Sequence, residues 1–298
     1  MMHTTNVTRL QITLLCLLLL SLSIRAAPMH TPVAYLAYSN GYWQVWVMSA
    51  DGTEQLQVTR SPYDKSRLSW YPDGQSLLVN GNQGELNRVN METAEETPIP
   101  VPLKGMNDAV LSPDGNQIAF SLSTSGSIDD NNIWLIDVDG KNQQKLTNMQ
   151  GLQHDPSWSP DGKRLYFLSG KGGQAHDIWQ LTLATHETEQ LTANSLYQFD
   201  VAAATDGAIA FSSNRTGNYE IWIHNKDGTL RQVTDHPGLD AKPAWSPDGK
   251  TLIFESTRDG QPNLWKIDIK GGEPEQLTHH ERGARAPVWY ATKEGVSP

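Results

Sequence analysis

The chain has 298 residues, of which 33 are acidic and 23 are basic, so its formal net charge is −10. Hydrophobic residues make up 38% and charged residues 19% of the sequence, which is typical of a folded protein and excludes a disordered one. The acidic balance argues against a nucleic-acid partner, because phosphates require a basic face. Ten tryptophans are an unusually large number, whereas cysteine occurs once.

The chain begins with the pattern of a secretory signal peptide. Residues 1–9 are polar and include Arg9, residues 10–24 form an almost unbroken apolar run, and small residues follow. Because a membrane span needs about 20 residues, we predict a signal peptide over residues 1–26, cleaved after Ala26, with an uncleaved anchor as the alternative. Cys16 lies in this run, without the small residues that precede a lipidated cysteine. The mature chain, residues 27–298, would then contain no cysteine ligand or disulfide and no membrane span.

The remaining sequence repeats itself with a period of about 45 residues. A Pro-Asp-Gly string or a close variant recurs with its aspartate at positions 73, 114, 161, 206 and 248. A second string, Ile-Trp or a variant, recurs at Val45-Trp46, Leu86-Asn87, Ile133-Trp134, Ile178-Trp179, Ile221-Trp222 and Leu264-Trp265. A third string closes the units at Val58-Thr59, Leu146-Thr147, Leu191-Thr192, Val233-Thr234 and Leu277-Thr278.

Each unit is predicted to form four short strands. In the unit that begins at Pro156, the alternating run 164–168, the Ile-Trp run 177–181 and the run 189–192 follow a Ser-Pro-Asp-Gly turn. Four-stranded units with this period are typical of a β-propeller. Residues 27–298 hold about six of them, so we predict a single all-β domain, a six-bladed β-propeller with four-stranded antiparallel blades.

The first unit lacks its innermost strand, and the end of the chain contains one additional strand that no other unit uses. Residues 34–38, 44–48 and 55–59 supply three strands, and residues 287–290 match the inner strands of the other units. We therefore expect the C-terminal strand to close the ring in blade 1, which removes free sheet edges. An open array of six units is the alternative.

The Trp-Ser-Pro-Asp-Gly strings at 158–162 and 245–249, followed by Ile-Trp and Gln-Leu-Thr strands, resemble the WD40-like propeller of the TolB family over about residues 33–290. TolB is the periplasmic component of the Tol–Pal envelope system, so the resemblance implies a periplasmic scaffold that binds an envelope protein, a Pal-like lipoprotein among the candidates. TolB carries an α/β domain and a TolA-binding segment before its propeller, and we expect neither of them in this protein. The same repeat occurs in prolyl-oligopeptidase-type peptidases and oligogalacturonate lyases.

Enzymatic motifs are missing from the sequence. It contains no Gly-x-Ser-x-Gly elbow, no His-Glu-x-x-His string and no EF-hand loop. We therefore expect a non-enzymatic protein without a cofactor, although a cation in the channel is compatible with the acidic residues there. The alternative is a carbohydrate-active lyase or hydrolase with a metal in the propeller channel, for which His154-Asp155 is the best-placed pair.

The starts of the inner strands should surround one mouth of the channel. The predicted binding ring consists of Arg67, Asp108, His154, Asp155, Asp200, Lys242 and Arg285. Side chains converge there from all blades, so a basic partner segment or a cation could bind the three aspartates. In the alternative interpretation, each aspartate accepts backbone N–H groups at the start of its own strand.

Nine of the ten tryptophans fall at two repeat positions, where we expect packing between blades: Trp70, Trp158, Trp245 and Trp289 on inner strands, and Trp46, Trp134, Trp179, Trp222 and Trp265 on third strands. Trp43 lies outside this register, at a predicted loop, and is the one candidate for direct contact with a ligand. The protein is expected to act as a monomer.

Overall fold

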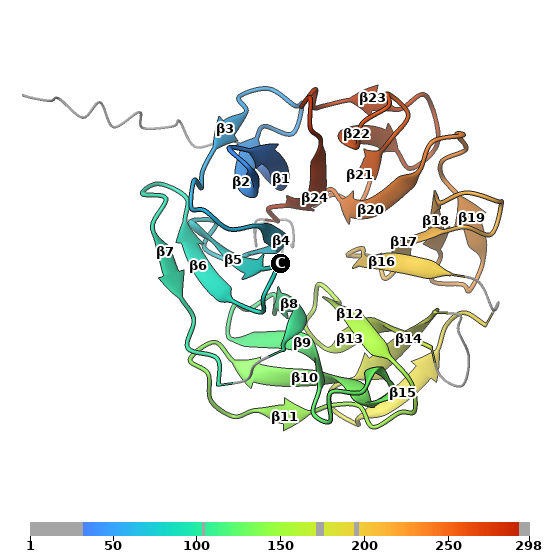
Figure 1. The fold of residues 1–298 in the computed structure, drawn as a ribbon. Helices are drawn as coiled ribbons and strands as arrows, with labels where there is room; N and C mark the ends of the chain where they lie inside the picture. The colour runs from blue at the N-terminus through green and yellow to red at the C-terminus, as the bar shows by residue number, and fades with distance from the viewer. Residues whose placement is uncertain (1–31, 103–104, 171–175, 194–196, 292–298) are drawn as a thin grey trace, which may run out of the picture.

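A computed structural model describes residues 32–102, 105–170, 176–193 and 197–291. The strands form six separate four-stranded sheets, which surround a central axis as the blades of a propeller (Figure 1). The six-bladed all-β fold is therefore confirmed. The predicted signal peptide lies outside the described residues, and no helix within them is long and apolar enough to cross a membrane.

The blades are numbered here in chain order, with the inner strand first. Blade 1 contains β24 (Ala284–Trp289), β1 (Val33–Ser39), β2 (Tyr42–Met48) and β3 (Leu56–Gln57), and blade 2 contains β4 (Lys65–Trp70), β5 (Ser76–Gly81), β6 (Leu86–Asn90) and β7 (Glu96–Pro98). Blade 3 contains β8 (Asn107–Leu111), β9 (Gln117–Ser123), β10 (Asn131–Asp137) and β11 (Gln144–Lys145), with the short 3-10 helix η1 (Ile128–Asp130) before β10.

The second half of the ring follows the same plan. Blade 4 contains β12 (Gln153–Trp158), β13 (Arg164–Ser169), β14 (Asp177–Thr182) and β15 (Glu187–Gln190), and blade 5 contains β16 (Gln198–Ala203), β17 (Ile209–Ser213), β18 (Glu220–His224) and β19 (Leu230–Gln232). Blade 6 contains β20 (Asp240–Trp245), β21 (Thr251–Ser256), β22 (Asn263–Asp268) and β23 (Glu275–Gln276).

Ring closure occurs in blade 1, as the sequence predicted. The C-terminal strand β24 pairs antiparallel with β1, with Val33 opposite Trp289 and Ala37 opposite Ala284. Tyr290 N–H also donates to the carbonyl oxygen of Pro32 at 2.9 Å, so the first and last described segments lie side by side. This pairing leaves the inner edge of β1 covered.

The Ser-Pro-Asp-Gly turns connect first and second strands. In blade 4, Gly162 takes the left-handed backbone conformation (φ 69°), and its N–H donates to the carbonyl of Ser159 at 2.9 Å. Asp161 Oδ1 accepts the N–H of Lys163 at 3.1 Å and the hydroxyl of Ser159 at 2.6 Å. The turn motif is therefore explained by local hydrogen bonds, which recur in each blade that carries it.

The threonine that closes five of the units fastens the outer strand to the third strand. Its Oγ1 accepts the N–H of the residue before the repeat tryptophan at 2.9 Å, in the pairs Thr59–Val45, Thr147–Ile133, Thr192–Ile178, Thr234–Ile221 and Thr278–Leu264. Blade 2 has Pro100 in this place, and its Leu86-Asn87 occupies the Ile-Trp position. The Leu-Thr and Ile-Trp strings are thus two halves of one structural contact.

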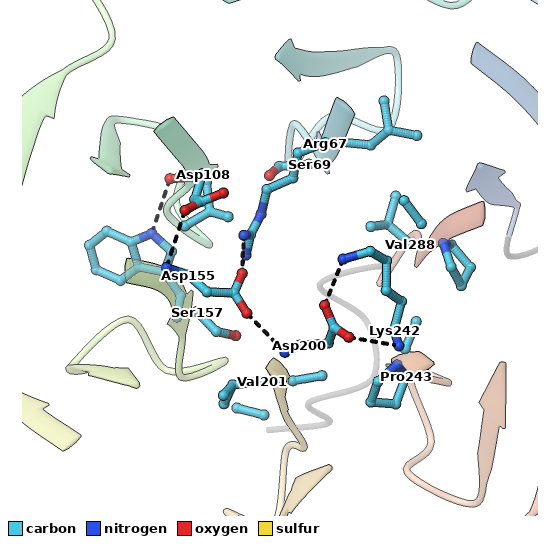
Figure 2. A pocket seen from close by; sticks show the side chains of 18 of the residues that line it. Arg67, Ser69, Asp108, Asp155, Ser157, Asp200, Val201, Lys242, Pro243 and Val288 are labelled. Carbon is cyan, nitrogen blue, oxygen red and sulfur yellow. Dashed lines mark hydrogen bonds and ion pairs between the residues drawn. The ribbon is translucent and has the colours of Figure 1, made fainter. Parts of the chain in front are cut away.

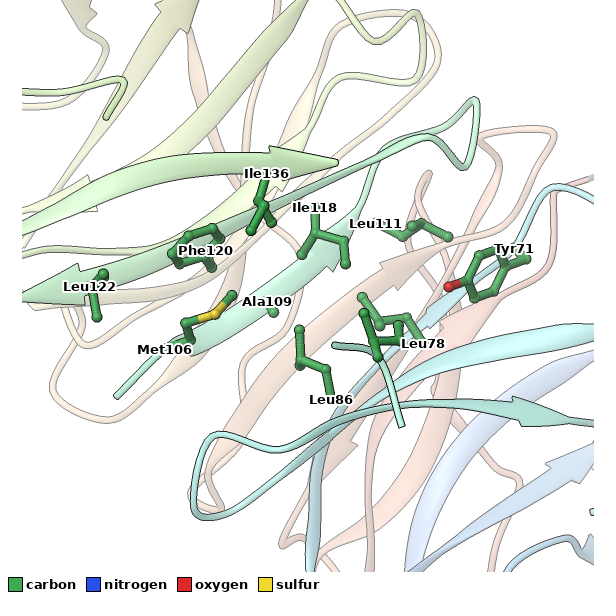
Figure 3. Packing of buried hydrophobic residues seen from close by; sticks show 11 residues of the cluster. Tyr71, Leu78, Leu86, Met106, Ala109, Leu111, Ile118, Phe120, Leu122 and Ile136 are labelled. Carbon is green, nitrogen blue, oxygen red and sulfur yellow. The ribbon is translucent and has the colours of Figure 1, made fainter. Parts of the chain in front are cut away.

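The hydrophobic core consists of six clusters, and each joins two neighbouring blades. Figure 3 shows the cluster between blades 2 and 3, where Leu78 and Leu86 face Met106 and Phe120. The cluster between blades 6 and 1 brings Ile253 and Leu264 against residues of β1, which rules out an open array. The predicted packing of the inner-strand tryptophans between blades is confirmed for Trp70, Trp158 and Trp245, whose indole N–H groups donate to carbonyls of the preceding blade.

Candidate binding site at the channel mouth

The inner strands of all six blades enclose a cavity of about 420 Å³ along the propeller axis. Five of the seven predicted ring residues line it, namely Arg67, Asp108, Asp155, Asp200 and Lys242 (Figure 2). Below this charged mouth the wall is formed by small and apolar side chains, including Val110, Val201 and Val288. The channel therefore has a charged end and an apolar interior.

A β-bulge at the start of the inner strands places the aspartates. In blade 4 the pairing shifts between His154 and Ser157, so that Asp155 has no partner on β13. Asp108, Asp155 and Asp200 all take the left-handed conformation, with φ of 54°, 53° and 59°. Aspartate tolerates this conformation better than most residues with a side chain. The bulge turns each carboxylate away from its own strand and toward the next blade.

The carboxylates form a chain of hydrogen bonds from blade to blade. Asp108 Oδ2 accepts the N–H of Asp155 at 3.4 Å, and Asp155 Oδ2 accepts the N–H of Asp200 at 3.0 Å. Asp200 Oδ2 in turn accepts the N–H of Lys242 at 3.3 Å. The backbone groups satisfied by the aspartates therefore belong to the following blade, and not to the aspartate's own strand. These bonds fix the register between blades 3, 4, 5 and 6.

Two of the three aspartates also form ion pairs. The Arg67 guanidinium extends from blade 2 to Asp155 in blade 4 and donates to the carbonyl of Pro156 at 2.9 Å. Lys242 Nζ lies 2.6 Å from Asp200 Oδ1. Burial would raise the pKa of Asp155, but Arg67 and Lys242 outweigh it and hold that pKa below its ordinary value. The carboxylate of Asp200 raises the pKa of Lys242.

Asp108 differs from the other two aspartates. Its Oδ2 receives the Asp155 N–H and lies 3.3 Å from the hydroxyl of Ser121, and it forms no ion pair with any residue in the described ranges. Arg67 and Lys242 form ion pairs with Asp155 and Asp200, so Asp108 is the aspartate of the three that is outside an ion pair, although its charge also raises the pKa of Arg67.

His154 and Arg285 lie outside the cavity lining. His154 Nε2 is 3.1 Å from His176 Nδ1, and burial lowers the pKa of both histidines. Asp155 is directed to Arg67 and not to His154. Among the described residues, no group of three His, Cys, Asp or Glu side chains is arranged to hold a metal ion.

Arg285 covers the tryptophan that the sequence singled out. Its guanidinium carbon lies 3.8 Å from the centre of the Trp43 ring, and the ring of Tyr38 packs edge-on against Trp43 at 5.6 Å. The sequence-based placement of Trp43 in a loop is wrong, because β2 begins at Tyr42. Pairing of Tyr38 with Trp43 extends the hairpin by two residues beyond the predicted strand, and the indole is only partly exposed.

Glu255 belongs to this chain of contacts, and sequence reasoning missed it. It lies on β21, where the charges of Lys242 and Asp200 act on its carboxylate. Burial raises the pKa of Glu255. Lys242 occupies the aspartate position of blade 6, and its charge acts against the raised pKa of Glu255. A lysine at a repeat position that holds aspartate in blades 3, 4 and 5 was the sequence signal for a carboxylate elsewhere in blade 6.

A family model described as the TolB beta propeller domain matches residues 30–209 and 203–296. A protein TolB homolog of Chlorobium luteolum is 29% identical over 160 residues, or 53% of this chain and 36% of that protein. The Tol-Pal system protein TolB of Bordetella pertussis is 27% identical over 66% of this chain and 43% of its own length. The chain therefore spans less than half the length of these relatives. The crystal structure of TolB from Acinetobacter baumannii superposes with a TM-score of 0.78 and 21% identity, over 88% of this chain and 67% of that one.

Proposed function

Because the chain belongs to the TolB β-propeller family, we propose that it is an exported, non-enzymatic propeller that binds another protein of the cell envelope. The binding face is the one on which the inner strands begin, and the periplasm is the compartment that suits this role. A Pal-like lipoprotein is the first candidate for the partner, since the Bordetella relative is named for the Tol-Pal system.

The observation that carries this proposal is the construction of the channel mouth. Charged side chains from five consecutive blades converge there, and hydrogen bonds between blades hold the aspartates in place. Such preorganised charge on a rigid ring favours recognition of a partner, because little ordering entropy is lost on binding. The reactive groups that an enzyme needs are instead paired with one another: Asp155 with Arg67, Asp200 with Lys242, and His154 with His176.

Capture of the partner tests the proposal. Purified protein that starts at residue 27 is immobilised, exposed to an envelope extract of the source organism, and the retained proteins are quantified by mass spectrometry. We expect one envelope protein to be enriched and to bind again when both components are pure. Retention of background proteins alone would contradict the proposed function.

The Asp108→Asn variant tests whether the channel mouth carries the binding. It removes the unpaired charge and keeps an acceptor for the Asp155 N–H, so the ring should stay intact. Glu189→Gln on the exposed outer strand β15 is the matched control. We expect capture to fall at least tenfold for Asp108→Asn and to stay unchanged for Glu189→Gln. Full capture by Asp108→Asn would exclude the mouth as the binding site.

A further inference from the structure

Blades 4, 5 and 6 carry a large apolar or aromatic residue at one repeat position beside the channel mouth. Leu152, Tyr197 and Leu239 immediately precede the inner strands of blades 4, 5 and 6, and their carbonyls accept equivalent N–H groups from Gly170, Asn214 and Thr257 at 3.0, 3.4 and 2.9 Å. Tyr197 is 40% and Leu239 is 39% exposed. The same position holds Gly283, Asp64 and Gly105 in blades 1, 2 and 3. At this repeat position, large apolar or aromatic residues are therefore confined to blades 4, 5 and 6.

Aromatic rings continue this apolar surface toward the channel. The ring of Phe199 lies 5.5 Å from that of His176 and 5.7 Å from that of Tyr219, and it stacks parallel to Tyr197 at 6.4 Å. His176 packs edge-on against His154 at 4.7 Å. We call this surface the apolar crescent and define it by His154, His176, Tyr197, Phe199, Tyr219 and Leu239.

The inner end of the apolar crescent lies beside the unpaired carboxylate. The N–H of Asp155, the residue that follows His154, donates to Asp108 Oδ2 at 3.4 Å, so Asp108 lies next to the inner end of the crescent. Asp155 is neutralised by Arg67, so Asp108 is the acid available to an incoming cation. An apolar surface therefore adjoins a carboxylate that forms no ion pair with any described residue.

We propose that the apolar crescent receives one segment of a partner protein, which places an aromatic or large aliphatic side chain against Tyr197, Phe199 and Leu239 and a Lys or Arg beside Asp108. The inference rests on the proposed function and specifies the chemistry of the partner. A net charge of −10 opposes a second copy of this chain as the occupant. Leu239 offers neither a ring face nor a hydrogen-bonding group to a sugar, which favours a peptide side chain over a glycan.

A displayed library of random 12-residue peptides, selected on the purified protein, tests the proposal without the natural partner. Enriched peptides should carry an aromatic or large aliphatic residue within a few positions of a Lys or Arg. Synthetic peptides of the enriched sequences are then titrated by fluorescence anisotropy. We expect Tyr197→Ser and Leu239→Ser to weaken the Kd at least tenfold, and Asp108→Asn to weaken it several-fold.

Two exposed leucines on outer strands provide matched controls. Leu56 on β3 is 43% exposed and Leu230 on β19 is 37% exposed, so Leu56→Ser and Leu230→Ser remove comparable apolar surface elsewhere. Both should leave the Kd within twofold of wild type, and Tyr197→Phe, which keeps the ring, should also retain binding. Thermal unfolding of each variant verifies that it folds.

The outcomes separate this inference from the proposed function. If no peptide is enriched, or if the peptides bind the crescent variants as tightly as wild type, the crescent is not a docking surface. An envelope protein that is captured equally well by wild type and by Tyr197→Ser and Leu239→Ser would leave the proposed function standing and overturn the crescent. Peptide binding that depends on the crescent, without any captured envelope protein, would support the crescent as a docking surface and contradict the proposed function.

Discussion

At the scale of single residues, the left-handed position near the start of five of the six inner strands affects how neighbouring blades are joined. Where an aspartate occupies it, the carboxylate accepts the N–H of the equivalent residue one blade further on. Where Lys242 occupies it, the side chain instead pairs backward with Asp200. One backbone conformation thus serves two kinds of contact, and the residue type selects between them.

Asp155 connects blade 2 to blade 5, because it binds both Arg67 and the N–H of Asp200. Asp155→Asn keeps an acceptor for the N–H but leaves the Arg67 guanidinium without its counter-charge. Since the two side chains are only 23% and 14% exposed, we expect the free energy of unfolding to fall by about 1–3 kcal/mol. Urea denaturation measures this. The double variant Arg67→Met/Asp155→Asn should recover part of the loss, and an unaffected midpoint for Asp155→Asn would contradict the assigned role.

The His154–His176 pair makes stability depend on pH. Burial lowers the pKa of both histidines in the folded protein. Unfolded histidines titrate near about 6.5, so unfolding takes up protons as the pH falls through that value, and the stability present at higher pH is lost. We expect the unfolding midpoint to decrease from pH 7.5 to pH 5.5 and to decrease less in His154→Phe. The exposed His186→Gln serves as the control and should behave like wild type.

At the scale of the strands, the outer strands are short, and in five of the six blades a closing threonine fastens the outer strand. β3, β11 and β23 have two residues each, so two ladder positions alone would hold them poorly. The threonine adds a buried side-chain bond at the end of the strand. In blade 6, Thr278 accepts the N–H of Leu264 and donates to Asn263 Oδ1, both at 2.9 Å.

Thr278→Val tests this contribution, because valine has the same shape without the hydroxyl. It leaves the buried N–H of Leu264 without an acceptor, which costs about 1–3 kcal/mol of unfolding free energy. Thr278→Ser should restore most of the stability, whereas Thr188→Val on the exposed strand β15 should change little. Equal denaturation curves for Thr278→Val and wild type would show that the threonine adds nothing beyond the ladder.

At the scale of the whole molecule, closure of the ring by β24 completes two of the six core clusters. Val288 and Trp289 pack into the clusters that join blade 1 to blades 2 and 6. Without β24, the inner edge of β1 and apolar groups of both clusters would face solvent, and exposed edges of this kind promote association between chains.

A chain that ends at Gly283 lacks β24 and tests the closure. We expect it to lose cooperative thermal unfolding and to form oligomers, as measured by light scattering after size-exclusion chromatography. A circular permutant that starts and ends in the exposed turn 225–229 and joins residue 291 to residue 32 by a short Gly/Ser linker retains every strand. Because Tyr290 and Pro32 are already hydrogen-bonded, this permutant should stay monomeric and fold cooperatively. A monomeric, cooperative truncation would show that closure is dispensable.

The sequence predicted the positions of those site residues that can be aligned through the repeat. Arg67, Asp108, Asp155, Asp200 and Lys242 could be aligned because each lies three residues before the same strand position, and they meet at the channel as expected. Arg285 and His154 share one alignment position, yet Arg285 turns to Trp43 and His154 to His176. Alignment gives a residue's place on its strand, but not the neighbour to which its side chain turns.

The sequence by itself determined the number of blades, the strands and turns within each blade, and the strand that closes the ring. These features follow from alternation, turn chemistry and recurrence, which act over a few residues at a time. Only the tertiary structure decided the partners of the charged residues, since Arg67 meets Asp155 across 88 residues and Asp155 meets the N–H of Asp200 across 45. It also gathered the rings of blades 4 and 5 into one surface beside Asp108, because contacts between blades depend on side-chain directions that no local pattern records.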